Sequence, residues 1–541
     1  MSRILVLGGY GGFGARISRR LAASSHEVLV AGRSMDKAAR FCREVAGTVP
    51  LQLDRSNVAE ALRHHRPAIT VDASGPFQSM DYAVPQACIA AGVHYCDIAD
   101  GREFVCGIGH LDKAAREAGV TVISGASSVP ALSGAGVREL AEGLDRVTAV
   151  EMAISASNQA TAGPAVARAI LGQVGRPLRV FRGGRWVSGF GWQQQIRQDF
   201  VISGLAPLRK RLTALADVPD LGLLPDRLPG RPACTFHAGT ELSLHNRALW
   251  LGSWLVRFGL VDDLSPLAPL AERLQRLTAS WGSDRSAMTV RLFGHAGTRR
   301  LERRWTLIAD RGDGPEIPGL SVPLVVDRIL SGAETPGARD AGEVLRLQDY
   351  SPAFNSLAIT TETVERELST PAYRLVMGQD FDRLPGALRH LHSPLRDAGA
   401  TGEAIVTGAP TRIGRLVARL MRFPPPGRHP LHVEFRECDG LERWTRDFGG
   451  HRFSSELQAK GGLLEERFGP LRFRFELPLT TDGLQMVMRE WSAFGIRLLL
   501  SLAPRSAASE WEENGTFHFD VPISLPAIGN IVHYRGWLHS S

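Results

Sequence analysis

Five glycines in seven positions, in the segment GGYGGFG at residues 8–14, constrain this chain more than any other feature. Glycine is favoured where a backbone must turn tightly or come close to another group. The segment follows the apolar run ILVL at residues 4–7, and it leads into Phe13, Ile17 and Leu21, which recur at helical spacing. This order predicts a strand, a tight turn and a helix.

The glycines also have the G-x-G-x-x-G spacing of a dinucleotide-binding loop, in the strand–turn–helix context that this fingerprint requires. We expect Gly9 to form the turn, Gly11 to let a pyrophosphate approach, and Gly14 to let helix and strand pack closely. The N-terminus of the helix offers N–H groups and partial positive charge to the phosphates. The alternative is a glycine-rich turn that holds no ligand. The residues assigned to the cofactor here are Gly9, Tyr10, Gly11, Gly12, Phe13 and Gly14.

The end of the next predicted strand, residues 26–31, distinguishes NAD from NADP. An NAD site holds an acidic residue there, which binds the ribose 2′-hydroxyl. This chain has Arg33 and Ser34 instead, with Lys37 one turn later. A guanidinium and a hydroxyl suit a 2′-phosphate and would leave a bare 2′-hydroxyl without its acceptor. We therefore expect NADP(H); the alternative is that Arg33 only solvates a strand end.

Strands and helices continue to alternate as far as about residue 130. Short apolar runs end at Asp54, Asp72, Asp97 and Ser124, with helical segments between them. This pattern predicts an α/β fold with a doubly wound parallel sheet of the Rossmann type, and ligands bind beyond the carboxyl ends of the strands in such sheets. Asp54 is therefore placed beside the cofactor. The other candidates at these ends are Ser74-Gly75-Pro76-Phe77, Asp97 and Ser127-Ser128.

Bulk properties narrow the class of protein. A chain of 541 residues, 44% hydrophobic and 22% charged, is typical of a globular protein with several domains. The net charge of +7 is modest, and no dense Lys/Arg run indicates a nucleic-acid partner. No apolar run approaches the roughly 20 residues of a membrane span. The six cysteines form no CxxC pair, as expected of reduced thiols, and the first strand leaves no room for a signal peptide. We expect a cytoplasmic protein.

A first domain over residues 1–130 precedes a different pattern. Residues 131–350 are expected to form an α+β domain for substrate binding and dimerisation, which makes a homodimer an expected assembly. Within it we predict a strand at 147–154, a helix from 162 to 171, a hairpin in 178–200 and a linker in the Gly- and Pro-rich residues 310–350. The helix at 248–260 carries Trp250, Trp254, Leu255 and Phe258 on one stripe, which either is buried or touches a membrane surface.

Residues 351–541 are expected to form a C-terminal α+β domain on an antiparallel sheet. Phe473 and Phe475 alternate with charged residues, Phe517 and Phe519 alternate with polar residues, and Asn514-Gly515 predicts a hairpin turn. A helix at 411–422 has an apolar stripe on one side and four arginines on the other. We expect it to pack across the sheet with the arginines outward, over either a solid core or an apolar cavity.

Several catalytic mechanisms lack their residues. No tyrosine has a lysine four positions later, as the short-chain dehydrogenases require, and no GxSxG motif indicates a serine hydrolase. Neither HExxH nor a cysteine cluster indicates a metal, so no metal site is expected. His390 and His392 form a lone pair, for which a surface or core role is expected.

Five segments in order, GGYGGFG, AGRSMDKA, VDASGPFQ, YCDIADG and SGASSVPALSGAG, resemble the saccharopine dehydrogenase-like reductases. That family includes saccharopine reductases and the trans-acting enoyl reductases of mycobacterial lipid synthesis. The resemblance covers about residues 1–350. Residues 351–541 look like an uncharacterised bacterial domain often found behind such a reductase.

The resemblance implies an NADP(H)-dependent oxidoreductase that reduces a C=N, C=O or activated C=C bond of a lipid-like, carrier-bound or other apolar substrate. Ser74, Gly75 and Pro76 would lie along the nicotinamide half, and Asp97 at the substrate cleft. Tyr82 and Ser128 are placed near it, with Asp97 or Tyr82 as proton donor. No amino-acid-binding arginine set aligns, so saccharopine itself is not expected as substrate. The alternative is a non-catalytic NADP(H) sensor with a C-terminal lipid- or partner-binding module.

Overall fold

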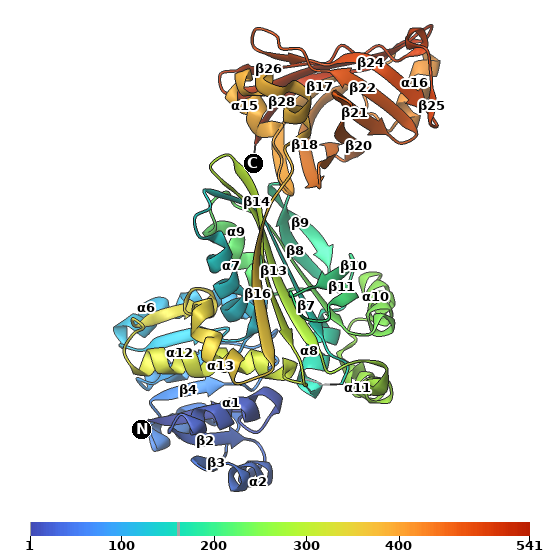
Figure 1. Cartoon of the computed structure of the whole chain (residues 1–541). Coiled ribbons are helices and arrows are strands. Elements are labelled where there is room, and N and C mark those ends of the chain that lie inside the picture. The colour runs from blue at the N-terminus through green and yellow to red at the C-terminus, as the bar shows by residue number, and fades with distance from the viewer. Residues whose placement is uncertain (1, 160–162, 541) are drawn as a thin grey trace.

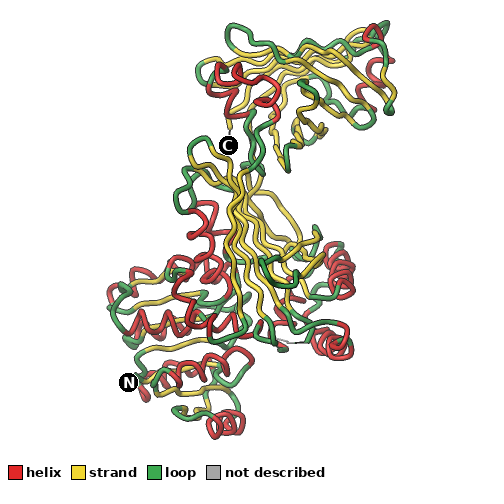
Figure 2. Tube along the Cα trace, in the orientation of Figure 1, coloured by secondary structure: helices red, strands yellow, loops and turns green. Residues whose placement is uncertain are grey.

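Three large β-sheets follow one another along the long axis of the molecule, of which the computed structural model describes residues 2–159 and 163–540 (Figure 1). The N-terminal sheet is flanked by helices, the middle sheet is long, and the C-terminal part consists mainly of strands with a few short helices (Figure 2). Within the described residues, no helix is long and apolar enough to cross a membrane.

The N-terminal sheet is parallel throughout and confirms the expected doubly wound fold. Its first strands have the order 3-2-1-4-5-6 of dinucleotide-binding sheets. Across the sheet the strands are β15 (Gly337–Asp340), β6 (Thr121–Ser124), β5 (His94–Asp97), β4 (Ile69–Asp72), β1 (Arg3–Leu7), β2 (Glu27–Gly32) and β3 (Thr48–Gln52). The helices between them are α1 (Gly12–Ala23), α2 (Met35–Glu44), α3 (Val58–His65), α4 (Ala83–Ala90), α5 (Arg102–Gly107) and α6 (Asp112–Glu117).

Residues 310–350 are not the linker that their Gly and Pro content predicted. They form α12 (Ser321–Leu330), whose Val322, Val325 and Val326 are fully buried, and β15, which pairs in parallel with β6. The chain thus returns to the first sheet about 200 residues after leaving it. Glycine and proline here end short elements rather than mark a flexible segment.

The middle sheet is mixed. Its order is β10 (Ile196–Phe200), β11 (Leu208–Leu215), β12 (Ala233–Thr240), β7 (Arg146–Ala156), β13 (Ser286–Ala296), β14 (Arg299–Ala309) and β16 (Ile359–Glu367), and β8 (Pro177–Arg182) pairs separately with β9 (Arg185–Phe190). The expected strand at 147–154 and the hairpin in 178–200 are confirmed. β16 was expected in the third domain; its polar sequence, largely exposed at the edge of the sheet, carries no apolar signal.

The helices of this middle part are α7 (Ser133–Ala141), α8 (Pro164–Gln173), α9 (Asp220–Arg227), α10 (Ser243–Arg257), α11 (Ala268–Leu277) and α13 (Ser351–Asn355). The predicted start of α8 at residue 162 lies outside the described residues. The stripe on α10 is only partly covered: Trp250 and Trp254 are half-buried, whereas Leu255 and Phe258 are exposed. The homodimer remains a prediction.

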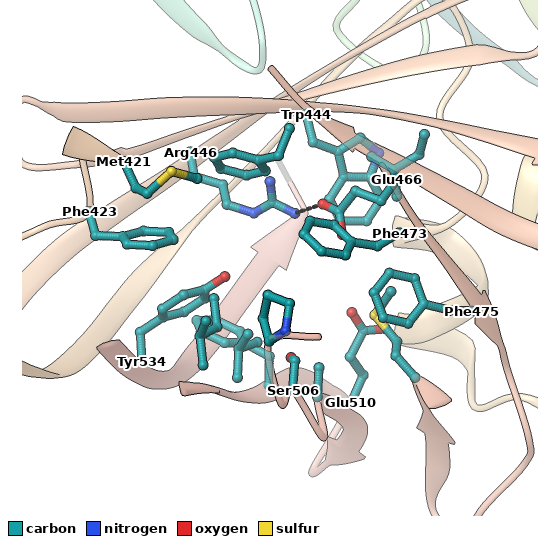
Figure 3. A pocket seen from close by; sticks show the side chains of 18 of the residues that line it. Met421, Phe423, Trp444, Arg446, Glu466, Phe473, Phe475, Ser506, Glu510 and Tyr534 are labelled. Atoms are coloured by element: carbon teal, nitrogen blue, oxygen red, sulfur yellow. Dashed lines mark ion pairs between the residues drawn. The ribbon is translucent and has the colours of Figure 1, made fainter. Parts of the chain in front are cut away.

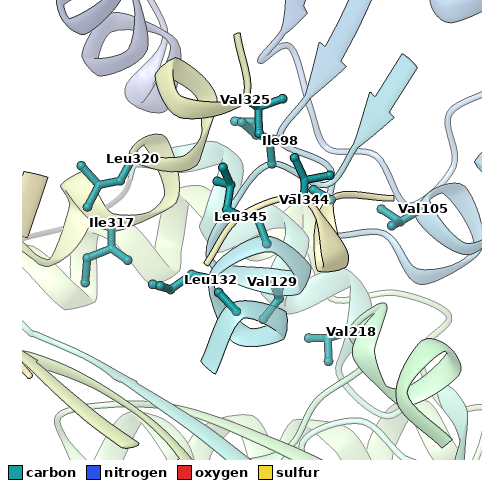
Figure 4. Close-up of a cluster of buried hydrophobic side chains, with 14 of the residues drawn as sticks. Ile98, Val105, Val129, Leu132, Val218, Ile317, Leu320, Val325, Val344 and Leu345 are labelled. Atoms are coloured by element: carbon teal, nitrogen blue, oxygen red, sulfur yellow. The ribbon is translucent and has the colours of Figure 1, made fainter. Parts of the chain in front are cut away.

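One apolar core joins the first two sheets. Figure 4 shows Ile98 and Val105 from the N-terminal domain, Val129 and Leu132 after β6, and Val218 from the middle part within one cluster. Ile317, Leu320, Val325, Val344 and Leu345 complete the part that is drawn. The carboxyl edge of the parallel sheet is therefore fixed against the middle sheet by packing rather than by a hinge.

The C-terminal sheet is antiparallel, as expected. Its order is β23 (Gly483–Gln485), β26 (Ser509–Glu513), β27 (Thr516–Leu525), β28 (Gly529–Ser540), β17 (Asp397–Gly408), β18 (Gly427–Cys438), β19 (Leu441–Phe448), β20 (His451–Lys460), β21 (Leu463–Phe468), β22 (Leu471–Glu476), β24 (Val487–Ala493) and β25 (Ile496–Arg497). Its helices are α14 (Ala372–Met377), α15 (Gly386–Leu391) and α16 (Arg412–Leu420). The predicted turn at Asn514-Gly515 joins β26 and β27, with both residues at positive φ.

The predicted helix at 411–422 exists as α16, but its apolar stripe does not pack across the sheet as expected. Ile413, Leu416 and Leu420 are 63%, 59% and 74% exposed. Val417 and Met421 alone of that stripe line the interior of the domain. The helix contacts β28 and lies at one end of the C-terminal domain, near β25, rather than over the middle of the sheet (Figure 1).

Candidate cofactor and substrate site

The glycine loop joins β1 to α1 with little space to spare. Gly9 lies in the expected turn, which the Gly11 N–H closes by donating to the Gly8 carbonyl oxygen at 2.8 Å, and Gly8 has a positive φ of +71°. A Cβ on Gly8 would lie 2.8 Å from the carbonyl oxygen of Ala73, and one on Gly9 would lie 2.9 Å from that of Val6. At Gly14 a Cβ would lie 2.1 Å from the Gly8 carbonyl oxygen, which confirms the close packing of helix on turn.

Gly11 differs from these glycines, because its surroundings are open. A Cβ there would meet the Gly8 carbonyl oxygen at 3.1 Å and, apart from its chain neighbours, no other atom of the described residues within 4 Å. α1 begins at the next residue, and none of the described side chains caps it. An uncapped helix N-terminus behind open space fits the pyrophosphate of a dinucleotide.

The end of β2 is tied to this loop. The Ser34 N–H donates to the Tyr10 hydroxyl at 2.9 Å, and the Tyr10 ring covers Gly32, where a Cβ would lie 2.5 Å from it. The Ser34 hydroxyl accepts from the Lys37 N–H and caps α2. The side chains of Arg33 and Lys37 are exposed here. Two cations at a capped helix start fit a phosphate on the ribose.

Asp54 lies at the end of β3, beside Arg33. Hydrogen bonds from the Ser56 N–H and hydroxyl, at 3.0 and 2.8 Å, lower the pKa of Asp54, and the positive charge of Arg33 adds to the effect. The carboxylate is exposed and ionised. Asp54 therefore lies beside Arg33, the residue that is expected to bind the 2′-phosphate.

Arg55, which the sequence analysis did not identify, joins Asp72 and Ser74 at the end of β4. Arg55 donates to Asp72 at 2.6 Å and to the Ser74 hydroxyl at 3.1 Å, and the Ser74 hydroxyl and N–H both donate to Asp72. Asp72 is fully buried, and burial raises its pKa although Arg55 opposes the rise. These bonds fix the start of Ser74-Gly75-Pro76 against Gly8. An arginine one position after a strand-end aspartate was the only sequence signal.

Asp97 is the last residue of β5, and its side chain is hydrogen-bonded to the loops that follow β5 and β6. Its Oδ1 accepts from the Ala99 N–H at 2.9 Å, the Gly125 N–H at 2.7 Å and the Ser124 hydroxyl at 3.0 Å. The side chain is 0% exposed, and Oδ2 has no hydrogen-bond partner among the described residues. Burial raises the pKa of Asp97 to about 7. In this structure Asp97 holds two loops together and does not face a cleft.

The other two catalytic candidates lie on either side of these loops. The Tyr82 hydroxyl donates to the Phe104 carbonyl at 2.8 Å, and the Tyr82 ring lies 4.8 Å from the Phe104 ring. Both contacts attach the Tyr82 side chain to α5. Burial raises the pKa of Tyr82. Ser128 is half-buried where the chain leaves β6. The three candidates surround one edge of the sheet, but no hydrogen bond joins any two of them among the described residues.

Two sequence families match the chain. Residues 4–123 match the model of the saccharopine dehydrogenase NADP-binding domain. The N-terminal domain belongs to that family. It is therefore an NADP(H)-binding domain, as Arg33 predicted. Residues 384–538 match DUF4166, a domain of unknown function. No curated protein sequence matches the chain.

Several solved structures are similar to the chain at low identity. The apo saccharopine dehydrogenase (L-Glu forming) of Saccharomyces cerevisiae is 14% identical with a TM-score of 0.47, over 67% of this chain and 100% of its own. GenD2 from gentamicin A biosynthesis, in complex with NAD, is 14% identical with a TM-score of 0.32, over 68% and 97%. Amine dehydrogenase from Mycobacterium smegmatis is 12% identical with a TM-score of 0.32, over 63% and 95%. Likeness at this level says nothing about a substrate.

Proposed function

We propose that the protein is an NADP(H)-dependent oxidoreductase that reduces a C=N, C=O or activated C=C bond of an apolar or carrier-bound substrate. The observation that carries this proposal is the open space in front of Gly11, at the uncapped start of α1 and within a domain of an NADP-binding family. The six cysteines, all free thiols, support the further proposal that it acts in the cytoplasm.

In this proposal the loop from Gly9 to Gly14 binds the pyrophosphate, and Arg33, Ser34 and Lys37 bind the 2′-phosphate. Asp54 lies beside this site and contributes through its electrostatic interaction with Arg33. Ser74-Gly75-Pro76, held by Arg55 and Asp72, lies along the nicotinamide half. NADPH supplies the hydride when bound, so the chain has only to orient the cofactor and handle one proton.

The residues proposed to act in proton transfer lie at the carboxyl ends of β5 and β6. Because Asp97 is enclosed, we assign it as a positioning residue that holds the loop after β6, and Ser128 at the end of that loop as the group that touches substrate. Tyr82 holds α5 through its bond to Phe104. Asp97→Ala removes the three hydrogen bonds that hold this loop, so it should slow turnover and leave NADPH affinity unchanged. Ser128→Ala should slow turnover further.

The test is transfer of deuterium from NADPH labelled at C4 to a molecule in a bacterial lipid and metabolite extract, followed by mass spectrometry. The expected result is NADPH binding together with at least one deuterated product that Gly11→Val abolishes. Binding of NADPH without any transfer would favour the non-catalytic sensor. Absence of NADPH binding would overturn both hypotheses.

A further inference from the structure

The C-terminal sheet encloses a cavity of about 200 Å³ (Figure 3). Its wall takes side chains from α14, α16 and most strands of the sheet, and nearly all of them are apolar. Phe473, Phe475 and Tyr534 contribute rings, and Met486 and Met488 contribute adaptable thioethers. One water needs only about 10–15 Å³ of such space, so the cavity is large enough for a chain of carbon atoms. The alternative of a solid core is therefore wrong.

The charged side chains on this wall are already paired. Arg446 lies 3.7 Å from Glu466 and donates to the Ser455 hydroxyl at 2.9 Å (Figure 3). Glu510 is bonded to the buried His392 at 2.6 Å. A wall with no unpaired charge favours an uncharged, apolar part of a ligand.

α16 connects this cavity with the outer surface. Val417 and Met421 line the cavity, while Ile413, Leu416 and Leu420 of the same helix point their apolar surface to solvent. Arginines occupy the other side of the helix, and no acidic residue occurs between positions 404 and 433. The exposed arginines are Arg412, Arg415, Arg419 and Arg422. An exposed apolar stripe beside uncompensated arginines is typical of a helix at a membrane surface.

A second exposed apolar segment continues the same margin. Phe494, Ile496 and Leu499 are 83%, 66% and 72% exposed, and Leu500 and Leu502 are also exposed. A row of contacts joins this segment to the end of α16. The ring of Phe423 lies 6.2 Å from that of Phe468, Phe468 is paired with Leu471, and Leu471 is paired with Ala493, the neighbour of Phe494. Leu471 and Phe468 also line the cavity.

We propose that α16 and residues 494–502 dock on an anionic lipid bilayer and that the cavity takes an acyl chain of an anionic lipid from it. Basic side chains are attracted to anionic head groups, while the exposed leucines and phenylalanine enter the interface. A second copy of the chain is a poorer occupant of this surface, because it would bring the same arginines together. The proposal goes beyond the oxidoreductase function and requires no NADPH.

The docking step is tested with the full chain and vesicles. The protein should sediment with vesicles of phosphatidylglycerol and phosphatidylcholine, and much less with phosphatidylcholine alone. The double variant Leu416→Asp/Leu420→Asp should lower vesicle binding at least tenfold. The matched control is Leu270→Asp/Leu274→Asp on α11, whose leucines are 52% and 50% exposed but line no part of this cavity. It should bind as the unchanged protein does. The reverse pattern, or equal binding to both vesicle types, would overturn the docking.

The cavity is tested with dansyl-labelled undecanoic acid. We expect saturable uptake of one probe per chain, displaced by unlabelled long-chain fatty acid. Val521→Trp fills the cavity from its wall and should abolish uptake while vesicle binding persists. Ala508→Leu, a smaller filling change on the same wall, should weaken uptake and serves if the tryptophan variant does not fold. No saturable uptake, or uptake unaffected by filling, would overturn the proposal. Failure of NADPH binding would leave both results unaffected.

Discussion

The Ser34 N–H donates to the Tyr10 hydroxyl at 2.9 Å, and this bond joins the two halves of the cofactor site. Tyr10 belongs to the loop assigned to the pyrophosphate, and Ser34 begins α2 beside Arg33. The proposed phosphate sites are thus held at a fixed separation before any cofactor binds. A preformed site loses less freedom on binding, so its charged contacts are expressed more fully in affinity.

Cofactor preference should depend on Arg33. A charge-assisted hydrogen bond contributes about 1.5–3 kcal/mol. Arg33→Asp should therefore lower NADPH affinity roughly 10- to 100-fold, and it should also bring NADH affinity level with it or above it. Titration of cofactor fluorescence measures both. Arg40→Asp makes the same charge change at an exposed position of α2 and should have little effect. Equal binding of NADH and NADPH by the unchanged protein would contradict the assignment.

Two glycines of the loop should separate binding from folding. Gly11→Val places a side chain in the open space proposed for the pyrophosphate, at a φ of −74° that valine tolerates. NADPH affinity should fall at least tenfold, about 1.4 kcal/mol, with a small change in Tm measured without cofactor. Gly14→Ala instead drives a Cβ to 2.1 Å from the Gly8 carbonyl oxygen and should cost about 1–3 kcal/mol or more in stability. A stable Gly14→Ala or an NADPH-binding Gly11→Val would contradict this division.

How much the sequence predicts depends on the range of the interactions involved. The glycine loop, the alternation up to residue 124 and the turn at Asn514-Gly515 follow from local spacing, and the structure has them. The positive φ of Gly8 and its close approach to Ala73 were not predicted, because β4 brings Ala73 to this turn from a distant part of the sequence. The pairing of Arg55 with Asp72 likewise depends on two neighbouring strand ends.

Features that depend on residues far apart in the sequence could not be predicted from local patterns. β15 joins the first sheet from position 337, and its short polar sequence Gly-Ala-Arg-Asp resembles a loop. In the C-terminal domain the alternating phenylalanines predict one apolar face, and Phe475, Phe517 and Phe519 are indeed buried. Whether that face closes on a core or a cavity depends on sheet curvature, which side-chain alternation does not encode.

Stability should depend on pH through Asp97. Burial raises its pKa to about 7, whereas an unfolded aspartate titrates near about 4. Between these pH values the native state holds a proton that the unfolded state has lost. The contribution of Asp97 to the free energy of unfolding therefore falls as pH rises from about 4 to 7. Asp97→Asn can keep the three bonds to Oδ1 and carries no charge. At pH 8 the free energy of unfolding of this variant should exceed that of the unchanged protein by an amount on the order of 1–3 kcal/mol, and at pH 4 this gain should be absent.

The measurement is thermal unfolding between pH 4 and 8, followed at the transition that NADPH shifts, because ligand binding marks the domain concerned. The exposed Asp482 provides the control: Asp482→Asn should show no gain that grows with pH. A constant difference between Asp97→Asn and the unchanged protein across this range would mean that Asp97 is ionised throughout.

Glu151 should contribute to the attachment of the C-terminal sheet to the middle sheet. This carboxylate on β7 accepts two hydrogen bonds from Arg396, at 2.6 and 3.0 Å, and a third from Arg291 at 3.3 Å. Glu151→Ala leaves both guanidiniums without this acceptor at a partly buried contact, at a cost of about 1–3 kcal/mol. The exposed Ser369 and Thr370 between the two sheets should then be cleaved at least fivefold faster in limited proteolysis, with NADPH affinity unchanged.

Glu367→Ala removes an exposed carboxylate that pairs with Arg299 at 3.5 Å and should not accelerate cleavage. Equal acceleration in both variants would mean that general loosening of the middle sheet, rather than the Glu151–Arg396 contact, controls the attachment.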